Sequence, residues 1–371
     1  MKSRKHIVIV ISDVDKALAF EWIARDLSDG FDLTFVLLNK GGSQLEDYLK
    51  RNGHKFRRIT INGKPSFPKA FLQLFWLFIK RRPHLIHAHL LTAQILALPA
   101  AFMAGVKNRV YTRHTSDFHH KYHRKGVFYD RLSNRFAKTV ISISEATRYV
   151  LRDLEGVAES KIKTIHHGFD FSSFVDVDEK RIARIKDKYN IQQSPVVGVI
   201  ARHIEWKGIQ YIVPAFAKLL KEEPDAVLVL ANAQGPHHTA ILDLLADVPG
   251  RNVRLIQFEE DSGALYRCFD VYVHTPVDAI CEAFGQTYVE ALACGIPSVF
   301  TLSGVAAEFV KDGTHACVVN FRDSESIYTS LLKLLRNPEL CQQLIANGRT
   351  FVLENFALQG MIEKLRRLYD A

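Results

Sequence analysis

Residues 269–301 read FDVYVHTPVDAICEAFGQTYVEALACGIPSVFT, and this stretch indicates the fold more clearly than any other. Two short runs with β-branched residues, Val271–Val273 and Ser298–Thr301, enclose a polar loop and the helical pattern Gln286–Ala293. A strand, a helix and a second strand in this order form the repeating unit of parallel sheets. The stretch therefore predicts an α/β fold built on a parallel sheet.

Two series of such units follow one another along the 371 residues, a length that suffices for two domains with a core each. In the first half we predict strands at Ile7–Ile11, Leu33–Leu38, Phe56–Ile59, Leu85–His87, Arg109–Thr112, Thr139–Ser142 and Ile162–Ile165. In the second half we predict further strands at Val196–Ile200, Ala226–Leu230 and Val253–Leu255, and further helices at Ile209–Glu222, Ala240–Ala246 and Ser324–Leu335. We expect two Rossmann-like domains, residues 1–170 and 171–355, that face each other across a cleft. A C-terminal helix in residues 356–371 is expected to pack back on the first domain.

The net charge of +9 is distributed unevenly. Residues 1–170 contain 29 Lys and Arg against 15 Asp and Glu, a net charge of +14, whereas the remainder contains 20 against 25. A basic half of this kind indicates an anionic partner. No recognition motif for nucleic acid accompanies the charge, so we do not expect nucleic acid to be that partner.

The distribution of apolar residues bears on the cellular location. The segment Leu85–Val106 has the length of a membrane span and lacks charged residues, but its histidines, Gln94 and Pro99 favour a strand end followed by a buried helix. Five cysteines without CxxC spacing indicate buried thiols in a reducing compartment. We expect a cytoplasmic protein, with peripheral attachment to the inner face of a membrane as the alternative. The segment Phe67–Phe78, followed by Lys80-Arg81-Arg82, is either a well-buried helix or an interfacial helix that docks on an anionic membrane.

The segment that follows Val271–Val273 also contains the side chains for an anion site. Gly285 permits a tight turn before the predicted helix, and the free N–H groups of Gln286 and Thr287 would then point at a diphosphate. Glu282 and Glu290 are suited to hydrogen bonds with vicinal hydroxyls, one pair on a sugar and one on a ribose. In the loop after Val196–Ile200, Arg202 and Lys207 can converge on the same diphosphate.

The segment Glu282–Pro297 resembles the E-x7-E signature of retaining glycosyltransferases with the GT-B fold, and especially of glycosyltransferase family four. The pattern Arg-x4-Lys-Gly at Arg202–Gly208 is similar to the same family, and the resemblance covers roughly residues 80–371. It implies that Glu282 contacts the donor sugar, that Glu290 binds the ribose, and that Arg202 and Lys207 stabilise the departing phosphate. The implied donor-binding residues are Gly198, Arg202, Lys207, Glu282, Ala283, Phe284, Gly285, Gln286, Thr287 and Glu290.

The first half supplies the remaining candidates. His114 follows the predicted strand Arg109–Thr112, and the resemblance implies a catalytic position close to the donor sugar and the acceptor. From the residues alone, a histidine at a strand end in a chain with 16 histidines is more often a plain polar loop residue. The family commonly has a Gly-Gly loop after the first strand, but this chain has Ser12–Lys16 without a glycine. We therefore expect Ser12 or Lys16 to take the place of those amides on the acceptor side.

The resemblance implies a retaining, metal-independent glycosyltransferase of the bacterial cell-surface polysaccharide or lipopolysaccharide type. It would move a sugar from an NDP-sugar, UDP- or GDP-linked, to a hydroxyl of a glycan or lipid-linked acceptor, without a cofactor. The DxD sequences at Asp13–Asp15 and Asp176–Asp178 and the pair His87 and His89 have no further ligands nearby in the sequence, so we expect no metal site. The alternatives are another GT-B enzyme of sugar nucleotides, an epimerase or a phosphorylase, and a non-catalytic protein that binds a nucleotide-sugar.

Overall fold

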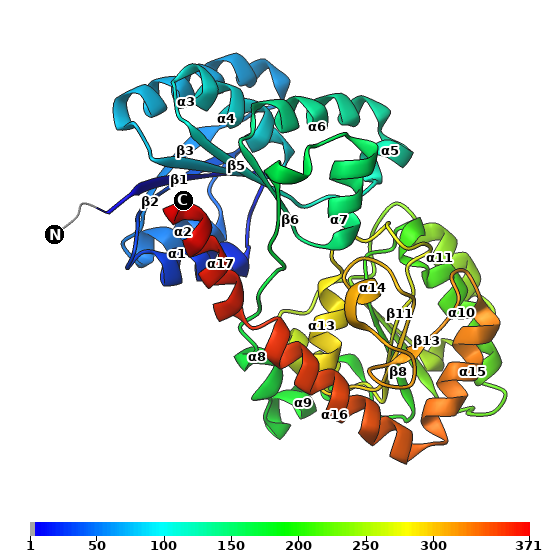
Figure 1. Cartoon of the computed structure of the whole chain (residues 1–371). Helices are drawn as coiled ribbons and strands as arrows, with labels where there is room; N and C mark the ends of the chain where they lie inside the picture. The colour runs from blue at the N-terminus through cyan, green and yellow to red at the C-terminus, as the bar shows by residue number, and fades with distance from the viewer. Residues whose placement is uncertain (1–3) are drawn as a thin grey trace. The chain divides into compact units, whose positions relative to one another are not determined.

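A computed structural model describes residues 4–371 (Figure 1). The chain forms two compact units. Unit 1 comprises the chain up to Phe169 together with Leu358–Ala371, and unit 2 comprises Asp170–Ala357. Each unit contains one parallel sheet with helices on both faces, so the predicted α/β class and the two Rossmann-like domains are confirmed.

The sheet of unit 1 has seven parallel strands in the order β3-β2-β1-β4-β5-β6-β7. The strands are β1 (His6–Ser12), β2 (Asp32–Asn39), β3 (Lys55–Thr60), β4 (Leu85–His89), β5 (Asn108–Arg113), β6 (Thr139–Ser142) and β7 (Ile162–Thr164). The run Ile7–Ile11 in β1 is fully buried, because helices cover both faces of the central strands. β1 and β4 are neighbours at the point where the strand order reverses.

Helices cover the two faces of this sheet (Figure 1). On one face lie α1 (Leu18–Leu27), α2 (Gln44–Arg51) and α17 (Leu358–Asp370), whose apolar residues share a core with β1 and β2. On the other face lie α3 (Phe67–Arg81) and α4 (Leu91–Met103). The remaining α-helices of unit 1 are α5 (Phe118–Tyr122), α6 (Arg124–Phe136) and α7 (Glu145–Tyr149). The C-terminal helix α17 thus completes the core of unit 1.

Helix α3 contains the aromatic stretch Phe67–Phe78, and it is not the well-buried helix that its composition favours. Only Ala70, Leu74 and Phe78 are buried, whereas Trp76 is 63% exposed. The buried residues are spaced by four and form one stripe, so the opposite stripe of the helix faces solvent although it is also apolar. Residues 4–371 contain no helix that is both long and apolar enough to cross a membrane.

The sheet of unit 2 has six parallel strands in the order β10-β9-β8-β11-β12-β13. The strands are β8 (Val196–Ile200), β9 (Val227–Ala231), β10 (Val253–Ile256), β11 (Val271–His274), β12 (Ser298–Phe300) and β13 (Cys317–Val318). The helices are α8 (Ser172–Val175), α9 (Glu179–Tyr189), α10 (Ile209–Leu219), α11 (His238–Leu245), α12 (Ser262–Tyr266), α13 (Gln286–Ala293), α14 (Ala306–Phe309), α15 (Ser324–Leu335) and α16 (Pro338–Asn355). The strand order reverses between β8 and β11, where a doubly wound sheet places its ligand.

Candidate functional site

The loops that follow β8 and β11 form the centre of the candidate site in unit 2. Because these strands are parallel neighbours, their carboxyl ends lie at the same edge of the sheet. The two loops touch at Gly208, where an added Cβ would lie 1.9 Å from the backbone oxygen of Thr275. Gly208 also has a positive φ of 76°, so both its backbone conformation and its close approach to β11 require glycine. This contact brings the Arg202–Gly208 loop to the end of β11.

Glu282 is the most constrained side chain at this edge. Its Oε1 lies 2.5 Å from Nζ of Lys207 and 3.3 Å from Nε2 of His274, the last residue of β11. Burial would raise the pKa of Glu282, but the charge of Lys207 and the hydrogen bond from His274 outweigh it and lower the pKa to about 2. Glu282 is therefore an ionised, buried carboxylate that accepts hydrogen bonds at neutral pH.

Helix α13 begins immediately after the turn that contains Glu282. Gly285 precedes its first residue with φ of 84°, and a Cβ there would lie 2.6 Å from the ring of Tyr288. The amide groups of Gln286 and Thr287, the first two residues of α13, have no acceptor within the helix, and the helix dipole adds partial positive charge. This turn is suited to an anion such as a diphosphate.

Glu290 lies in the same helix and is partly buried. Its Oε2 accepts a hydrogen bond of 3.0 Å from the hydroxyl of Tyr266 in α12. Burial raises the pKa of Glu290 to about 7, and the bond from Tyr266 opposes this shift only in part. The two glutamates of the E-x7-E segment thus differ: Glu282 is ionised at pH 7, whereas burial favours the protonated form of Glu290.

The other predicted donor-binding residues lie at different depths. Arg202 is exposed and makes no ion pair with any residue of the described part of the chain, so its guanidinium is available to a ligand. Phe284 is buried and packs edge-on against Phe356, so any contact of Phe284 with a ligand would come from its backbone. Gly198 lies inside β8, where a Cβ would meet the ring of Phe269 at 2.1 Å. That packing accounts for Gly198 and differs from the donor contact expected from the sequence.

His114 of unit 1 belongs to a group of four histidines at the ends of the strands. His89 Nδ1 lies 3.0 Å from His114 Nε2, and the ring of His167 stacks on that of His114 at 5.7 Å between centroids. His87 is hydrogen-bonded to the hydroxyl of Tyr369 at 2.7 Å. Burial, together with the adjacent histidines, lowers the pKa of His114 well below its ordinary value. His114 is therefore neutral at pH 7, and with Nε2 bonded to His89 its Nδ1 can either donate or accept a hydrogen bond.

The loop after β1 contains Ser12 and Lys16, the two residues predicted on the acceptor side. Ser12 is fully buried, and its Oγ accepts a hydrogen bond of 3.2 Å from the backbone N–H of Ala93 in the first turn of α4. This bond caps α4, which accounts for Ser12 as a structural residue, and its contact with an acceptor stays a prediction. Asp13 has φ of 53°, a conformation usually left to glycine. Lys16 is exposed.

Two features of the site were not predicted from the sequence. His274, which bonds Glu282, ends a strand as many packing residues do, so no sequence signal separates it from them. Gly304 has φ of 58°, and a Cβ there would lie 2.8 Å from Cβ of Glu282 and 2.6 Å from the backbone oxygen of Phe284. The sequence Ser303-Gly304 after a strand could have indicated this close approach.

Two family models match the chain: "Glycosyltransferase Family 4" over residues 20–173 and "Glycosyl transferases group 1" over residues 181–351. The capsular polysaccharide biosynthesis glycosyltransferase CapM of Staphylococcus aureus is 24% identical over 345 residues, which cover 90% of this chain and 89% of CapM. The GDP-mannose-dependent alpha-(1-6)-phosphatidylinositol monomannoside mannosyltransferase of Mycolicibacterium smegmatis is 28% identical over 227 residues, 59% of each chain.

Solved structures agree on the fold. The Anabaena protein HepE in complex with UDP-glucose aligns with a TM-score of 0.84 at 19% identity, over 97% of this chain and 98% of HepE. WaaG, a glycosyltransferase involved in lipopolysaccharide biosynthesis, aligns with a TM-score of 0.73 at 14% identity, over 98% and 99% of the two chains. Both likenesses concern the arrangement of strands and helices.

Proposed function

The chain belongs to the GT-B glycosyltransferases, with a family 4 domain followed by a group 1 domain, and from this premise we propose that it transfers a sugar from an NDP-sugar to a hydroxyl of a glycan or lipid-linked acceptor. We propose further that the reaction retains the anomeric configuration and needs no metal ion. Retention rests on the resemblance of the E-x7-E segment.

The observation that carries the proposal is the ion pair of Lys207 and Glu282 beside the first turn of α13. An ionised Glu282 accepts hydrogen bonds from the hydroxyls of the donor sugar. The ammonium group of Lys207 has three donors, so it can hold Glu282 and still bind a phosphate oxygen. One cluster thus binds both the sugar and the diphosphate.

Charge neutralisation without a metal ion is the second part of the proposal. As the glycosidic bond to the diphosphate breaks, negative charge grows on the phosphate oxygens. Arg202, Lys207 and the amides at the start of α13 would stabilise that charge, and such preorganised groups act strongly on developing charge. Glu290 would accept hydrogen bonds from the ribose hydroxyls of the nucleotide.

Two relatives support the choice of donor class. HepE was crystallised with UDP-glucose, and the mycobacterial relative is GDP-mannose-dependent. UDP- and GDP-sugars are therefore the first candidates for this chain. In unit 1, the neutral His114 would hydrogen-bond a hydroxyl of a substrate.

A screen for nucleotide binding followed by a transfer assay tests the proposal. We expect UDP or GDP to raise the thermal midpoint, and Glu282→Ala and Lys207→Ala to abolish the transfer of sugar from the corresponding NDP-sugar. Lys218→Ala is the matched control, because Lys218 forms an exposed ion pair with Glu325 on the surface of unit 2. Unchanged transfer by both site variants, with every NDP-sugar tried, would refute the assignment.

A further inference from the structure

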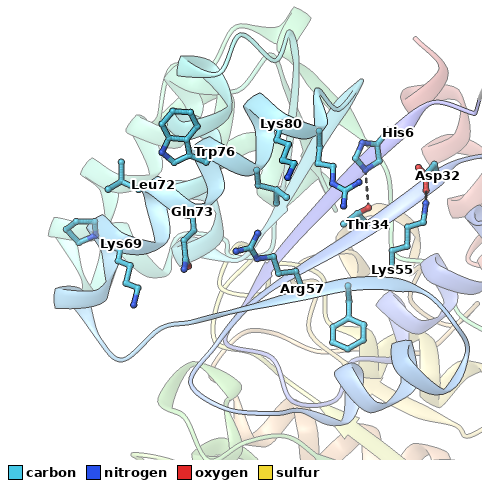
Figure 2. Close-up of a pocket in the computed structure, with 14 residues that line it drawn as sticks. His6, Asp32, Thr34, Lys55, Arg57, Lys69, Leu72, Gln73, Trp76 and Lys80 are labelled. Carbon is cyan, nitrogen blue, oxygen red and sulfur yellow. Dashed lines mark hydrogen bonds and ion pairs between the residues drawn. The ribbon is translucent and has the colours of Figure 1, made fainter.

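A groove of about 1370 Å³ lies in unit 1 between helix α3 and the strands β1, β2 and β3 (Figure 2). His6, Asp32 and Lys55, the first residues of these three strands, form one side of it. The opposite side is formed by residues of α3, among them Lys69 and Trp76. The groove therefore lies on one face of the sheet, between the starts of three strands and α3.

The position of the groove separates it from the chemistry proposed for this chain. In a parallel sheet all strands start at one edge and end at the other. The groove is lined by residues at the starts of β1, β2 and β3, whereas His114 follows the end of β5. A ligand in the groove would lie at the opposite edge of the sheet from His114, so the groove is a separate surface.

The charges of the groove are not balanced within the protein. Asp32, the single carboxylate among its lining residues, is paired with Lys55 at 2.6 Å. Four further cations line the groove, and none of them forms an ion pair with another residue of the described chain: Arg57, Lys69, Lys80 and Arg81. Figure 2 shows Arg57 on the strand side, with Lys69 and Lys80 along the helix. An anionic partner would neutralise this excess.

Apolar side chains lie on the same exposed surface. Leu72, Trp76 and Ile79 are 55%, 63% and 38% exposed, and their spacing of four and three residues places them on one stripe of α3. Tryptophan is enriched at the boundary between lipid headgroups and acyl chains, and Lys and Arg reach from such a stripe to the headgroups. A soluble anion would use the cations but would leave this apolar stripe in water.

We infer that the α3 face of unit 1 binds the surface of an anionic phospholipid bilayer. The stripe Leu72, Trp76 and Ile79 enters the headgroup region, and the unpaired cations of the groove contact the lipid phosphates. Both the apolar stripe and the cations contribute to binding, because burial of apolar area and attraction to anionic lipids add to one another. The inference is independent of the donor site, which lies in unit 2.

Flotation of the full chain with vesicles tests this inference. We expect the protein to float with vesicles of phosphatidylcholine and phosphatidylglycerol, to stay in solution with phosphatidylcholine alone, and to be released as salt is raised. The double variants Leu72→Ser/Trp76→Ser and Lys80→Gln/Arg81→Gln should each weaken binding roughly tenfold or more. The second variant should also reduce the dependence on salt. Thermal stabilisation by UDP or GDP should be unchanged in both.

A matched control comes from α6, which also exposes an aromatic residue and a lysine. Phe128 is 66% exposed and Lys125 is exposed on the same helix, so Phe128→Ser/Lys125→Gln removes similar groups elsewhere in unit 1. This control should float like the parent protein. Equal loss of binding in the control, or no flotation with anionic vesicles at low salt, would overturn the inference. A further contrary result would be that glycerol phosphate releases the protein from the vesicles at an ionic strength where chloride does not. That result would also overturn the inference, because it would show that the groove binds a small phosphate anion.

Intrinsic fluorescence locates the contact. The chain has three tryptophans, and Trp76 is the one in the proposed surface. Anionic vesicles should shift its emission to shorter wavelength, because the indole leaves water. Trp76→Phe should abolish this shift, while Trp22→Phe should keep it. A shift that persists in Trp76→Phe would place the lipid contact elsewhere on the chain and contradict the inference.

Discussion

Glu282 shows how a buried carboxylate can stay ionised. Its neighbours are a lysine at 2.5 Å and a histidine at 3.3 Å, and the histidine is itself kept from protonation by burial. The attraction between Glu282 and Lys207 therefore opposes the desolvation of both groups, and removal of one partner leaves the other unpaired. The same pair that holds the candidate donor site together also contributes to the stability of unit 2.

This arrangement makes the contribution of Glu282 to stability dependent on pH. Because its pKa is lowered from 4.5 to about 2, its stabilisation is fully present above pH 4.5 and is lost as the pH falls through about 2. The difference corresponds to about 3 kcal/mol. We expect the free energy of unfolding of the parent protein to fall more steeply with acid than that of Glu282→Gln, as measured by urea unfolding from pH 7 to pH 3. Parallel curves for the two proteins would contradict the prediction.

Glu290 should show the opposite dependence. Its pKa is raised to about 7, so the folded state favours the protonated form, and its contribution to stability is lost as the pH rises from 4.5 through 7. Glu290→Gln should therefore unfold at higher temperature than the parent at pH 8, by an amount equivalent to ~1–3 kcal/mol, and at the same temperature near pH 4.5. The amide oxygen of Gln can still accept the bond from Tyr266.

The same titration bears on ligand binding. If the carboxylate of Glu290 binds the ribose, the affinity of the parent for UDP or GDP should increase as the pH rises through 7, as calorimetry would show. Glu290→Gln should bind more weakly at pH 8 and without this trend. If the nucleotide affinity of the parent protein does not change with pH, the carboxylate of Glu290 does not bind the ribose.

Single residues of the site could be predicted where a spacing carries information. The interval between Glu282 and Glu290 and the pattern from Arg202 to Gly208 led to the two loops that the structure joins at Gly208 and Thr275. The role of His274 could not be predicted, because it depends on how the end of β11 lies beside the turn that contains Glu282. That arrangement exists only in the folded protein. The burial of Ser12 could not be predicted, since it depends on Ala93 of α4, 81 residues further along the chain.

At the scale of elements, the start of helix α13 requires a glycine at position 285, immediately before the first helical residue. A residue with a side chain would be strained at φ of 84°, and its Cβ would lie 2.6 Å from the ring of Tyr288. We expect Gly285→Ala to lower the free energy of unfolding by about 1–2 kcal/mol, the usual cost of the left-handed conformation for a non-glycine residue. The variant should also weaken nucleotide binding, because the first turn of α13 would shift.

Gly250→Ala is the control for this prediction. Gly250 has no atom within 4 Å of an added Cβ, and it lies in the same unit. Chemical denaturation of both variants gives the comparison. Equal stability of the two, together with normal nucleotide affinity, would show that the boundary of α13 tolerates a side chain.

The strands could be predicted well because each central one is a short apolar run covered on both faces. β8 (Val196–Ile200) and β6 (Thr139–Ser142) have the predicted bounds. β13 (Cys317–Val318) was not predicted, because two residues carry no periodicity. The exposure of α3 could not be decided either: a helix that is apolar all round does not reveal which stripe the sheet covers.

At the scale of the whole molecule, the chain ends in the unit where it begins. Tyr369 in α17 is fully buried in unit 1, and its hydroxyl is bonded to His87, 282 residues earlier. Tyr369→Phe keeps the ring but leaves Nδ1 of a buried histidine without a partner. We expect a loss of about 1–3 kcal/mol in the stability of unit 1, measured by thermal unfolding. No loss would mean that water replaces the hydroxyl.

The division of the chain into two units predicts which strands a bound nucleotide protects from hydrogen exchange. The residues proposed to bind the donor, among them Lys207, Glu282 and Glu290, all lie in unit 2, whose core is separate from the cores of unit 1. A ligand that binds only the folded state stabilises it by about 2.7 kcal/mol at a concentration one hundred times its Kd. Hydrogen exchange followed by mass spectrometry should therefore show slower exchange with UDP or GDP in β8, β11 and α13. The central strands β1 and β4 should exchange at the same rate with and without nucleotide, which provides the internal control. Equal protection of β1, β4, β8 and β11 would mean that the two units unfold together. Protection of unit 1 alone would mean that the nucleotide binds there, and this would contradict the proposed donor site.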